Sequence, residues 1–288
     1  MLDRLGEFRD SQLTLWPEAK KNYDALERVE RKAFTFGPFT CYAQMNPARK
    51  VSTGARIDAK AIAARPCFLC RKNRPDVQEA EPILDGWEFL VNPFPIFPLH
   101  FTIASVNHIP QGGIPLEMAS MAERLPGMTV FFNGARAGAS APDHLHCQAV
   151  ATLELPLMRY LEEGGDPAEL PFKVAYRVVT PDLVGMKYLA ELKDYCGIDA
   201  ATSLADAGLV NAFMWIGGDG LLRYAVVPRR RHRPLCYSAD GLEGFMISPG
   251  AIDMAGVMVV PREEDFRRLT ADDVTAIHAD VALPSGPL

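Results

Sequence analysis

The sequence lacks a membrane span, a secretory signal and a dense set of cysteines. No uninterrupted apolar run among its 288 residues reaches the roughly 18 that a transmembrane helix needs. The first residues are charged, and no apolar stretch with a small-residue cleavage site follows them. The six cysteines are spread along the whole chain, unlike those of a disulfide-bonded secreted scaffold. We therefore expect a cytoplasmic protein with reduced thiols and no membrane association.

The sequence also lacks the excess of basic residues that is typical of general nucleic-acid binders. Its 30 lysines and arginines are outnumbered by 36 aspartates and glutamates, which gives a formal net charge of −6. Nucleic acid is therefore not expected as a partner, and a phosphate-bearing ligand would have to meet cations gathered locally. The hydrophobic fraction of 48% is ordinary for a globular protein, and this length allows one large domain or two small ones.

Hydrophobic periodicity predicts a mixture of helices and strands. Residues 15–33 carry an apolar stripe at helical spacing with Pro17 in the first turn, and residues 34–50 have a strand-like pattern. The simplest arrangement of the remaining strands is an antiparallel sheet with a helix packed on it, an α+β fold. Strands are expected at 87–92, 99–104, 128–132 and 144–152, and a helix is expected over residues 115–124.

The second half of the chain repeats this pattern in outline. Strands are predicted at 209–216 and 221–227, and a helix near 185–196 separates the halves. The first predicted hairpin is followed by His108-Ile109-Pro110 and the second by His232-Arg233-Pro234, which suggests an internal duplication. The match is short, so generic similarity between hairpins explains it equally well. A strand at 256–260 and a helix at 270–283 complete the expected elements.

Two histidines and a glutamine alternate along one predicted strand. His144, His146 and Gln148 are spaced two residues apart, so an extended strand would present all three on one face. A loop of small residues, 134–142, comes before them. Two imidazoles and an amide behind such a loop favour a site that handles an oxyanion. A polar strand face with incidental histidines fits this spacing equally well.

A Cys-x-x-Cys pair lies earlier in the chain. By itself, Cys67-x-x-Cys70 is compatible with a zinc site, a redox pair or two core thiols. Together with His108 and His144 it supplies four ligands of the types found in closed tetrahedral zinc sites. In this interpretation His144 is a structural ligand and His146 is left for chemistry. The alternative is four unconnected residues.

His146 is the candidate nucleophile. A neutral imidazole can attack phosphorus and form a covalent phosphoramidate, and donors must then stabilise the charge on the phosphoryl oxygens. The amide of Gln148 can supply one donor, and backbone N–H groups between Gly138 and Ser140 can supply others. Arg136 is a candidate for neutralising charge, although a solvent-facing loop cation is the ordinary case.

Two further polar segments are candidates for substrate contacts. The run 229–233 is the densest basic patch, and Arg229 and Arg231 could hold a phosphate or phosphosugar. A solvated loop is an equally good interpretation of that run. Gln44, Asn46 and Arg49 could line a polar ligand surface, and a solvated strand end explains them as well.

The segment His144-Leu145-His146-Cys147-Gln148 resembles the H-x-H-x-Q signature of the nucleotidyltransferase branch of the histidine-triad superfamily. This branch contains galactose-1-phosphate uridylyltransferases, diadenosine-tetraphosphate phosphorylases and GDP-hexose phosphorylases. Asn133 and the turn 138–142 are also similar to that branch, whereas Asp143 is one extra residue relative to the uridylyltransferase pattern. By this resemblance His146 accepts the nucleotidyl group and Gln148 stabilises the intermediate, and Asn133 belongs to the phosphate site.

Other blocks extend the resemblance over residues 40–270. Those most similar to GDP-hexose phosphorylases are residues 44–49, 91–111, 143–149 and 248–266, whereas the four zinc-ligand candidates match the uridylyltransferase branch. The acceptor is therefore open between inorganic phosphate, a sugar 1-phosphate and water. A third histidine, typical of the hydrolase branch, is replaced by Gln148, and this favours transfer or phosphorolysis because an amide is a poor acid–base group.

The resemblance implies a histidine-triad-like antiparallel sheet with packed helices, in two similar halves at 1–160 and 161–288. It implies a nucleotidyltransferase or phosphorylase acting on a nucleoside-diphosphate sugar through a nucleotidyl-histidine, with GDP-hexose phosphorolysis as the first hypothesis. Hexose-1-phosphate uridylyl transfer is the second, and a non-catalytic, zinc-stabilised nucleotide-binding protein is the third. The expected partners are a nucleotide sugar with phosphate or a sugar 1-phosphate, and a homodimer is a candidate assembly.

Overall fold

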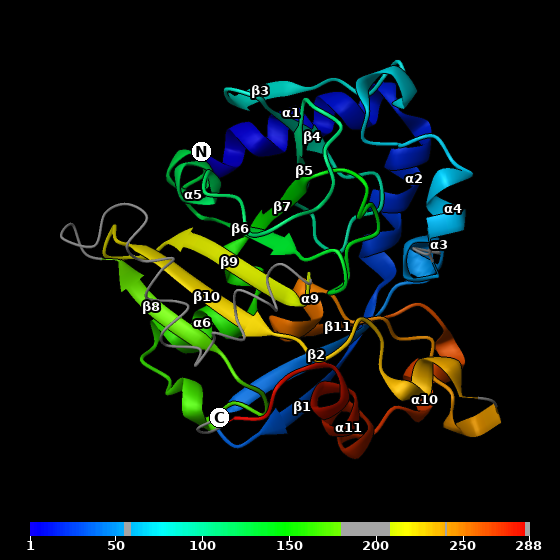
Figure 1. The fold of residues 1–288 in the computed structure, drawn as a ribbon, viewed down its shortest axis with the longest axis vertical. Helices are drawn as coiled ribbons and strands as arrows, with labels where there is room; N and C mark the ends of the chain where they lie inside the picture. Colours follow the sequence, from blue (N-terminus) through cyan, green and yellow to red (C-terminus); the bar gives the residue numbers. More distant parts are fainter. Residues whose placement is uncertain (55–58, 180–207, 240, 286–288) are drawn as a thin grey trace.

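The computed structural model describes residues 1–54, 59–179, 208–239 and 241–285 (Figure 1). They form an α+β fold with one eight-stranded sheet and one three-stranded sheet. Every pair of neighbouring strands in the larger sheet is antiparallel. No helix within these ranges is long and apolar enough to cross a membrane.

The larger sheet combines strands from both halves of the chain. The halves meet where β6 pairs with β9, with Phe131 opposite Phe213. The proposed halves therefore share one sheet; the boundary between residues 160 and 161 stays a prediction. In spatial order the strands are β3 (Glu81–Leu84), β4 (Trp87–Val91), β5 (His100–Ser105), β7 (His146–Ala151), β6 (Met128–Asn133), β9 (Val210–Ile216), β10 (Leu222–Pro228) and β8 (Ala175–Val179).

Both faces of this sheet are buried, and the alternation of side chains along each strand divides the core in two. In β6, Phe131 joins one hydrophobic cluster, whereas Val130 and Phe132 join the other. The cluster that contains Val130 is covered by α1 and α5, and the cluster that contains Phe131 packs against the smaller sheet and the C-terminal helices. Central strands such as β6 and β9 therefore have almost continuous apolar sequences.

The smaller sheet lies beside the C-terminal helices α10 and α11 (Figure 1). Its strands are β1 (Glu30–Phe36), β2 (Phe39–Met45) and β11 (Val257–Val260); β2 pairs antiparallel with β1 and parallel with β11. The helices are α1 (Leu2–Leu15), α2 (Pro17–Asp24), α3 (Lys50–Thr53), α4 (Ala59–Ala63), α5 (Met118–Arg124), α6 (Pro156–Glu162), α9 (Ala251–Met254), α10 (Glu263–Arg268) and α11 (Ala271–Val281).

The strands predicted around the histidines are confirmed, whereas the helix predicted at 15–33 is confirmed only in part, as α2 from Pro17 to Asp24. One helix ends at Leu15 and the next begins at Pro17, since proline restricts the residue before it and Trp16 has φ −122° and ψ 85°. The last residues of the predicted helix belong to β1, whose pairing with β2 overrides their helical pattern. The strand predicted from residue 144 begins at His146, and the helix predicted at 185–196 lies outside the described residues.

A buried histidine makes the stability of this fold depend on pH. His278 of α11 packs edge-on against Phe172, with ring centroids 5.0 Å apart, and neither ring nitrogen has a hydrogen-bonding partner among the described residues. Burial lowers the pKa of His278 to about 4. Because the folded-state pKa lies below the unfolded value of about 6.5, its contribution is complete above about pH 6.5 and is lost as the pH falls towards about 4.

We expect His278→Leu to reduce the fall in the free energy of unfolding between about pH 7 and about pH 5. Urea unfolding of the variant and the wild type at a series of pH values measures this fall. Part of the dependence of the free energy of unfolding on pH should remain in the variant, because other histidines are also buried. Two curves that stay parallel over the whole range would contradict the assignment.

Candidate functional site

Two cysteines and two histidines meet at one end of β7. The ligand atoms of Cys67, Cys70, His108 and His144 all lie within 4.8 Å of one another. The sulfur of Cys67 is 3.3 Å from His144 Nδ1, and the sulfur of Cys70 is 3.2 Å from His108 Nδ1. The structure thus brings together all four of the residues that the sequence suggested as metal ligands, from three separate loops.

The ring of His144 is oriented as a metal ligand would be. Its Nε2–H donates to the carbonyl oxygen of Ser105 at 2.8 Å, so the lone pair is on Nδ1, which faces the two sulfurs. Burial is the main cause that lowers the pKa of His144. Two thiols and two imidazoles with this geometry fit a closed, zinc-type tetrahedral site.

His146 begins β7 beside this cluster, and its side chain is also fixed in one tautomer. Its Nδ1 lies 2.8 Å from the carbonyl oxygen of His144, which can only accept, so the ring proton is on Nδ1 and Nε2 carries the lone pair. Burial lowers the pKa of His146 to about 4. Gln111 holds the backbone in place: its Oε1 accepts from His146 N–H at 2.9 Å and its Nε2 donates to His146 O at 3.0 Å.

Gln148 lies two residues along the same strand, and His100 determines the direction of its amide. The Nδ1 of His100 accepts from Ile96 N–H at 3.1 Å, so the ring proton is on Nε2. That Nε2–H donates to Gln148 Oε1 at 2.8 Å, and Asn92 Nδ2 donates to the same oxygen at 3.3 Å. Because His100 and Asn92 hold the amide oxygen, the NH₂ group of Gln148 is turned away from these two residues.

His146 and Gln148 line the same cavity, as the alternation along a strand predicted. This space, the large cavity, has a volume of about 580 Å³. Phe68 and Leu69 from the Cys-x-x-Cys loop form part of its wall, so that loop and the two catalytic candidates border the same space. Other lining residues are Trp16, Glu18, Arg65, Asn73, Gln78, Leu90, Asn92, Phe94 and Thr102. His144 does not line the cavity, which agrees with a separate role for it.

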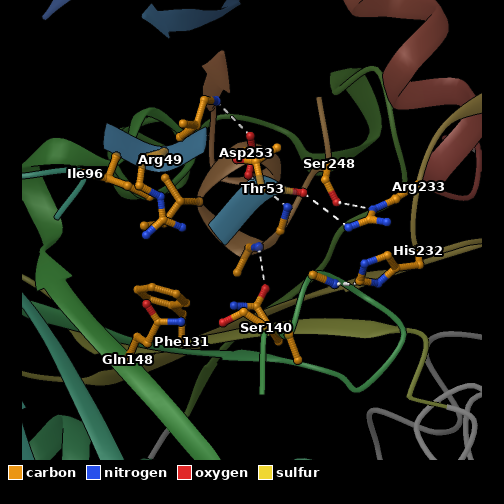
Figure 2. Close-up of a pocket in the computed structure, with 17 residues that line it drawn as sticks. Arg49, Thr53, Ile96, Phe131, Ser140, Gln148, His232, Arg233, Ser248 and Asp253 are labelled. Carbon is orange, nitrogen blue, oxygen red and sulfur yellow. Dashed lines mark hydrogen bonds between the residues drawn. The ribbon is translucent and has the colours of Figure 1, made fainter. Parts of the chain in front are cut away.

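A small cavity of about 60 Å³ borders the large one (Figure 2). Arg49, Ser140 and Gln148 line both spaces, whereas His146 lines only the large one. In Figure 2 Arg49 and Gln148 lie on one side of the small cavity, and His232, Arg233 and Ser248 lie on the other. Sequence analysis did not select Arg233 or Ser248; the only signal was that Arg233 belongs to the basic run at 229–233.

The small-residue loop at 134–142 is held tightly by the second half of the chain. Gly138 has φ +99°, and a Cβ there would lie 2.4 Å from the Cα of Gly250, so only glycine fits. Gly138 N–H donates to His232 Nδ1 at 3.3 Å, and Asn211 donates to Ala137 O at 2.7 Å. The backbone beside Ser140 is therefore fixed before any ligand arrives.

Asn133, at the end of β6, lines the small cavity and also supports this loop. Its Oδ1 accepts from Asn211 Nδ2 at 3.0 Å and from Ala251 N–H at 2.7 Å. The predicted phosphate contact of Asn133 stays a prediction, since its side-chain oxygen already accepts hydrogen bonds from β9 and α9.

The polar segment at the end of β2 holds a turn in place. Gln44 donates to the carbonyl oxygen of Ile96 at 2.9 Å, Asn46 to that of Pro95 at 3.1 Å and Arg49 to that of Phe94 at 2.7 Å. Gln44 and Asn46 are buried and line neither cavity, whereas Arg49 lines both. These contacts give Gln44 and Asn46 a structural role, and ligand binding by them stays a prediction.

The other predicted arginines lie outside both linings. Arg229 is fully buried, and its guanidinium donates to Asn211 Oδ1 at 2.6 Å and to backbone carbonyl oxygens that include those of Val281 and Pro249. Arg231 forms an ion pair with Asp280 at 3.1 Å. Arg136 is exposed. Phosphate binding by these three arginines is a prediction to which the geometry adds no support.

The fold is shared with an enzyme of known structure. A family model described as domain of unknown function DUF4922 matches residues 8–151, and no curated protein matches the chain. The yeast Ap4A phosphorylase Apa2 in complex with AMP is similar over 95% of this chain and 98% of its own, with 17% identity and a TM-score of 0.60. The same enzyme in complex with Ap4A gives 16% identity, 95% and 99% coverage and a TM-score of 0.60. The expected α+β fold, an antiparallel sheet with packed helices, is confirmed.

The two fixed histidines should be visible as opposite tautomers. At neutral pH we expect the ring proton of His146 on Nδ1 and that of His100 on Nε2, because their acceptors are a carbonyl oxygen and an amide oxygen. Long-range ¹H–¹⁵N spectra of histidine-labelled protein distinguish the two forms. Gln148→Leu should shift only the His100 signals, and a shared tautomer would contradict the assigned network.

Proposed function

The chain belongs to the family described as domain of unknown function DUF4922, and we propose that it transfers a nucleotidyl group from a nucleoside-diphosphate hexose to inorganic phosphate. GDP-hexose is the first candidate donor. The observation that carries this proposal is the fixed tautomer of His146, which leaves the Nε2 lone pair in a ring that lines the large cavity. The resemblance of residues 144–148 to the H-x-H-x-Q signature supports it.

The first half-reaction would be an attack of His146 Nε2 on the α-phosphorus of the donor. An N–P bond forms, the bond from the α-phosphorus to the bridging oxygen breaks, and a hexose 1-phosphate leaves with the electron pair. The ring becomes positively charged, and the carbonyl oxygen of His144, 2.8 Å from Nδ1, stabilises that charge. In the second half-reaction an oxygen of inorganic phosphate attacks the same phosphorus, the N–P bond breaks, and a nucleoside diphosphate leaves.

Gln148, Arg49 and Ser140 would stabilise the phosphoryl oxygens during both steps. These three residues line both cavities and would supply donors on the side of the α-phosphate that His146 does not occupy. The amide of Gln148 is oriented beforehand by His100, so its NH₂ group needs no reorganisation when charge develops. An amide cannot act as a base on water, which favours phosphorolysis over hydrolysis.

The large cavity suits a nucleoside. Its volume of about 580 Å³ falls within the roughly 300–1,000 Å³ that is usual for small-molecule sites. Phe68 offers an aromatic face near Arg65, whose guanidinium lies 4.9 Å from the ring centroid. A dinucleoside polyphosphate is an alternative donor, since the neighbouring structures are those of an Ap4A phosphorylase with AMP and with Ap4A. Hexose-1-phosphate uridylyl transfer and a homodimeric assembly remain further hypotheses.

We propose that the cluster of Cys67, Cys70, His108 and His144 holds a structural zinc ion. Its donor set fits, and the second hydrogen bond of His144 fixes the ligating nitrogen. A bound ion would supply folding energy and no open coordination position. These residues would join the Phe68 side of the large cavity to the strand that begins at His146.

Trapping the intermediate tests the nucleophile. With a donor labelled in its α-phosphate, the wild type should retain acid-labile, base-stable label, because an N–P bond forms at His146. His146→Ala should retain none, and His278→Leu, which changes a histidine that lines neither cavity, should label normally. GDP-hexose, UDP-hexose and Ap4A as separate donors identify the substrate class.

Equal labelling of the wild type and His146→Ala would overturn the nucleophile assignment. Thermal stabilisation of the wild type by nucleotides without label from any donor would favour the non-catalytic binding protein.

Metal content tests the zinc proposal. Elemental analysis of protein purified without chelators should find about one zinc per chain, because one closed site binds one ion. Cys67→Ser should lose the metal and much of its thermal stability, whereas Cys147→Ser, a buried cysteine outside the cluster, should keep the metal. A metal-free wild type that unfolds at the same temperature with and without a chelator would contradict the proposal.

A further inference from the structure

The small cavity is a separate compartment that the nucleophile does not reach. It shares Arg49, Ser140 and Gln148 with the large cavity but not His146. We propose that this compartment is the binding site for inorganic phosphate, the acceptor, with Arg233 and Ser248 as recognition residues from the second half of the chain. The identification of this phosphate as an acceptor rests on the proposed function, whereas phosphate binding there does not.

The size of the compartment suits a phosphate group. Its volume of about 60 Å³ is several times the roughly 10–15 Å³ that one water molecule needs, so a group of a few atoms, such as one tetrahedral oxyanion, can enter.

Two guanidinium groups form opposite walls of the compartment (Figure 2). Arg233 is held by Nε donating to Ser248 Oγ at 3.1 Å, by NH2 donating to Thr53 O at 3.2 Å, and by the ring of Tyr237, 4.1 Å from the guanidinium carbon. Arg49 is held by the carbonyl oxygen of Phe94. Planar, fixed guanidinium groups are well suited to phosphate, because they present several donors in a set geometry.

One carboxylate, that of Asp253, also lines the compartment, and backbone N–H groups donate to both of its oxygens. Its Oδ1 accepts from Val259 N–H and its Oδ2 accepts from Gly250 N–H, both at 2.8 Å. Both oxygens of this carboxylate therefore have backbone donors, and the lining supplies the guanidinium groups of Arg49 and Arg233 beside it.

The chemistry of an in-line transfer gives the compartment two uses. The group that leaves in the first half-reaction and the phosphate that enters in the second both lie on the side of the α-phosphorus away from His146 Nε2. The small cavity is lined by Gln148 and Ser140 but not by His146, so it would lie on this side of the α-phosphorus. The β-phosphate of the donor would occupy it first, and inorganic phosphate would occupy it after the sugar phosphate has left.

Inorganic phosphate alone is the probe for this site. Thermal unfolding is followed as sodium phosphate replaces sodium chloride at constant ionic strength and pH. The wild type should be stabilised in a saturable way, and Arg233→Met should bind phosphate about tenfold more weakly or worse, because a charge-assisted contact is lost. Arg230→Met is the matched control, since Arg230 is exposed three residues away and its guanidinium donates to Ala279 O.

Two milder variants guard against a folding defect in Arg233→Met. Arg233→Lys keeps the charge and should show intermediate affinity, whereas Ser248→Ala removes only a hydroxyl group and should weaken binding by a smaller factor. Phosphate stabilisation that is equal in all variants, or absent from the wild type, would overturn the proposed site.

A labelling experiment separates this inference from the proposed function. If phosphate binds in an Arg233-dependent way but no label appears on His146, the anion site stands and the transfer reaction fails. If His146 is labelled and phosphate binding does not depend on Arg233, the transfer reaction stands and the site fails. Where both hold, phosphate should discharge the label from the wild type and from Arg230→Met about tenfold more readily than from Arg233→Met.

Discussion

The hydrogen bond from His146 Nδ1 to the carbonyl oxygen of His144 is the contact on which the site depends. It joins two residues of one short segment whose side chains point to different places: the ring of His144 faces Cys67 and Cys70, and the ring of His146 lines the large cavity. The carbonyl group that fixes the tautomer of the candidate nucleophile thus belongs to a residue of the cluster. The structural zinc ion that we propose there would steady His146 without taking part in the reaction.

A second set of contacts fixes the other catalytic candidate. Gln44, Asn46 and Arg49 donate to three consecutive carbonyl groups of the turn at 94–96, and the N–H of Ile96 donates to His100, which orients Gln148. Every polar group in this sequence of contacts is buried or partly buried, so each would be costly to leave without a partner. The segment at 44–49 thus supports the site from a distance, and only Arg49 lines the cavities.

The candidate site is completed where the two halves of the chain meet. The family model covers residues 8–151, which contain the cluster, His146 and Gln148. The loop before them is held by Asn211 and His232, and the small cavity is closed by Arg233 and Ser248. The solved neighbours match across 95% of the chain, which agrees with a fold in which both halves share one sheet.

The sequence by itself predicted that His146 and Gln148 share a face, because side chains alternate with a period of two along a strand. It also predicted the central strands and the ligand types of the cluster. Only the tertiary structure revealed the contacts of Gln111, His100 and Arg233, since these contacts join segments that lie far apart in the chain and leave no local periodicity. The same reason explains Arg229: a run of basic residues does not determine whether a guanidinium faces a ligand or, as here, buried carbonyl groups. The local sequence pattern determines on which face of a strand a side chain lies, and packing between distant segments determines which groups it contacts there.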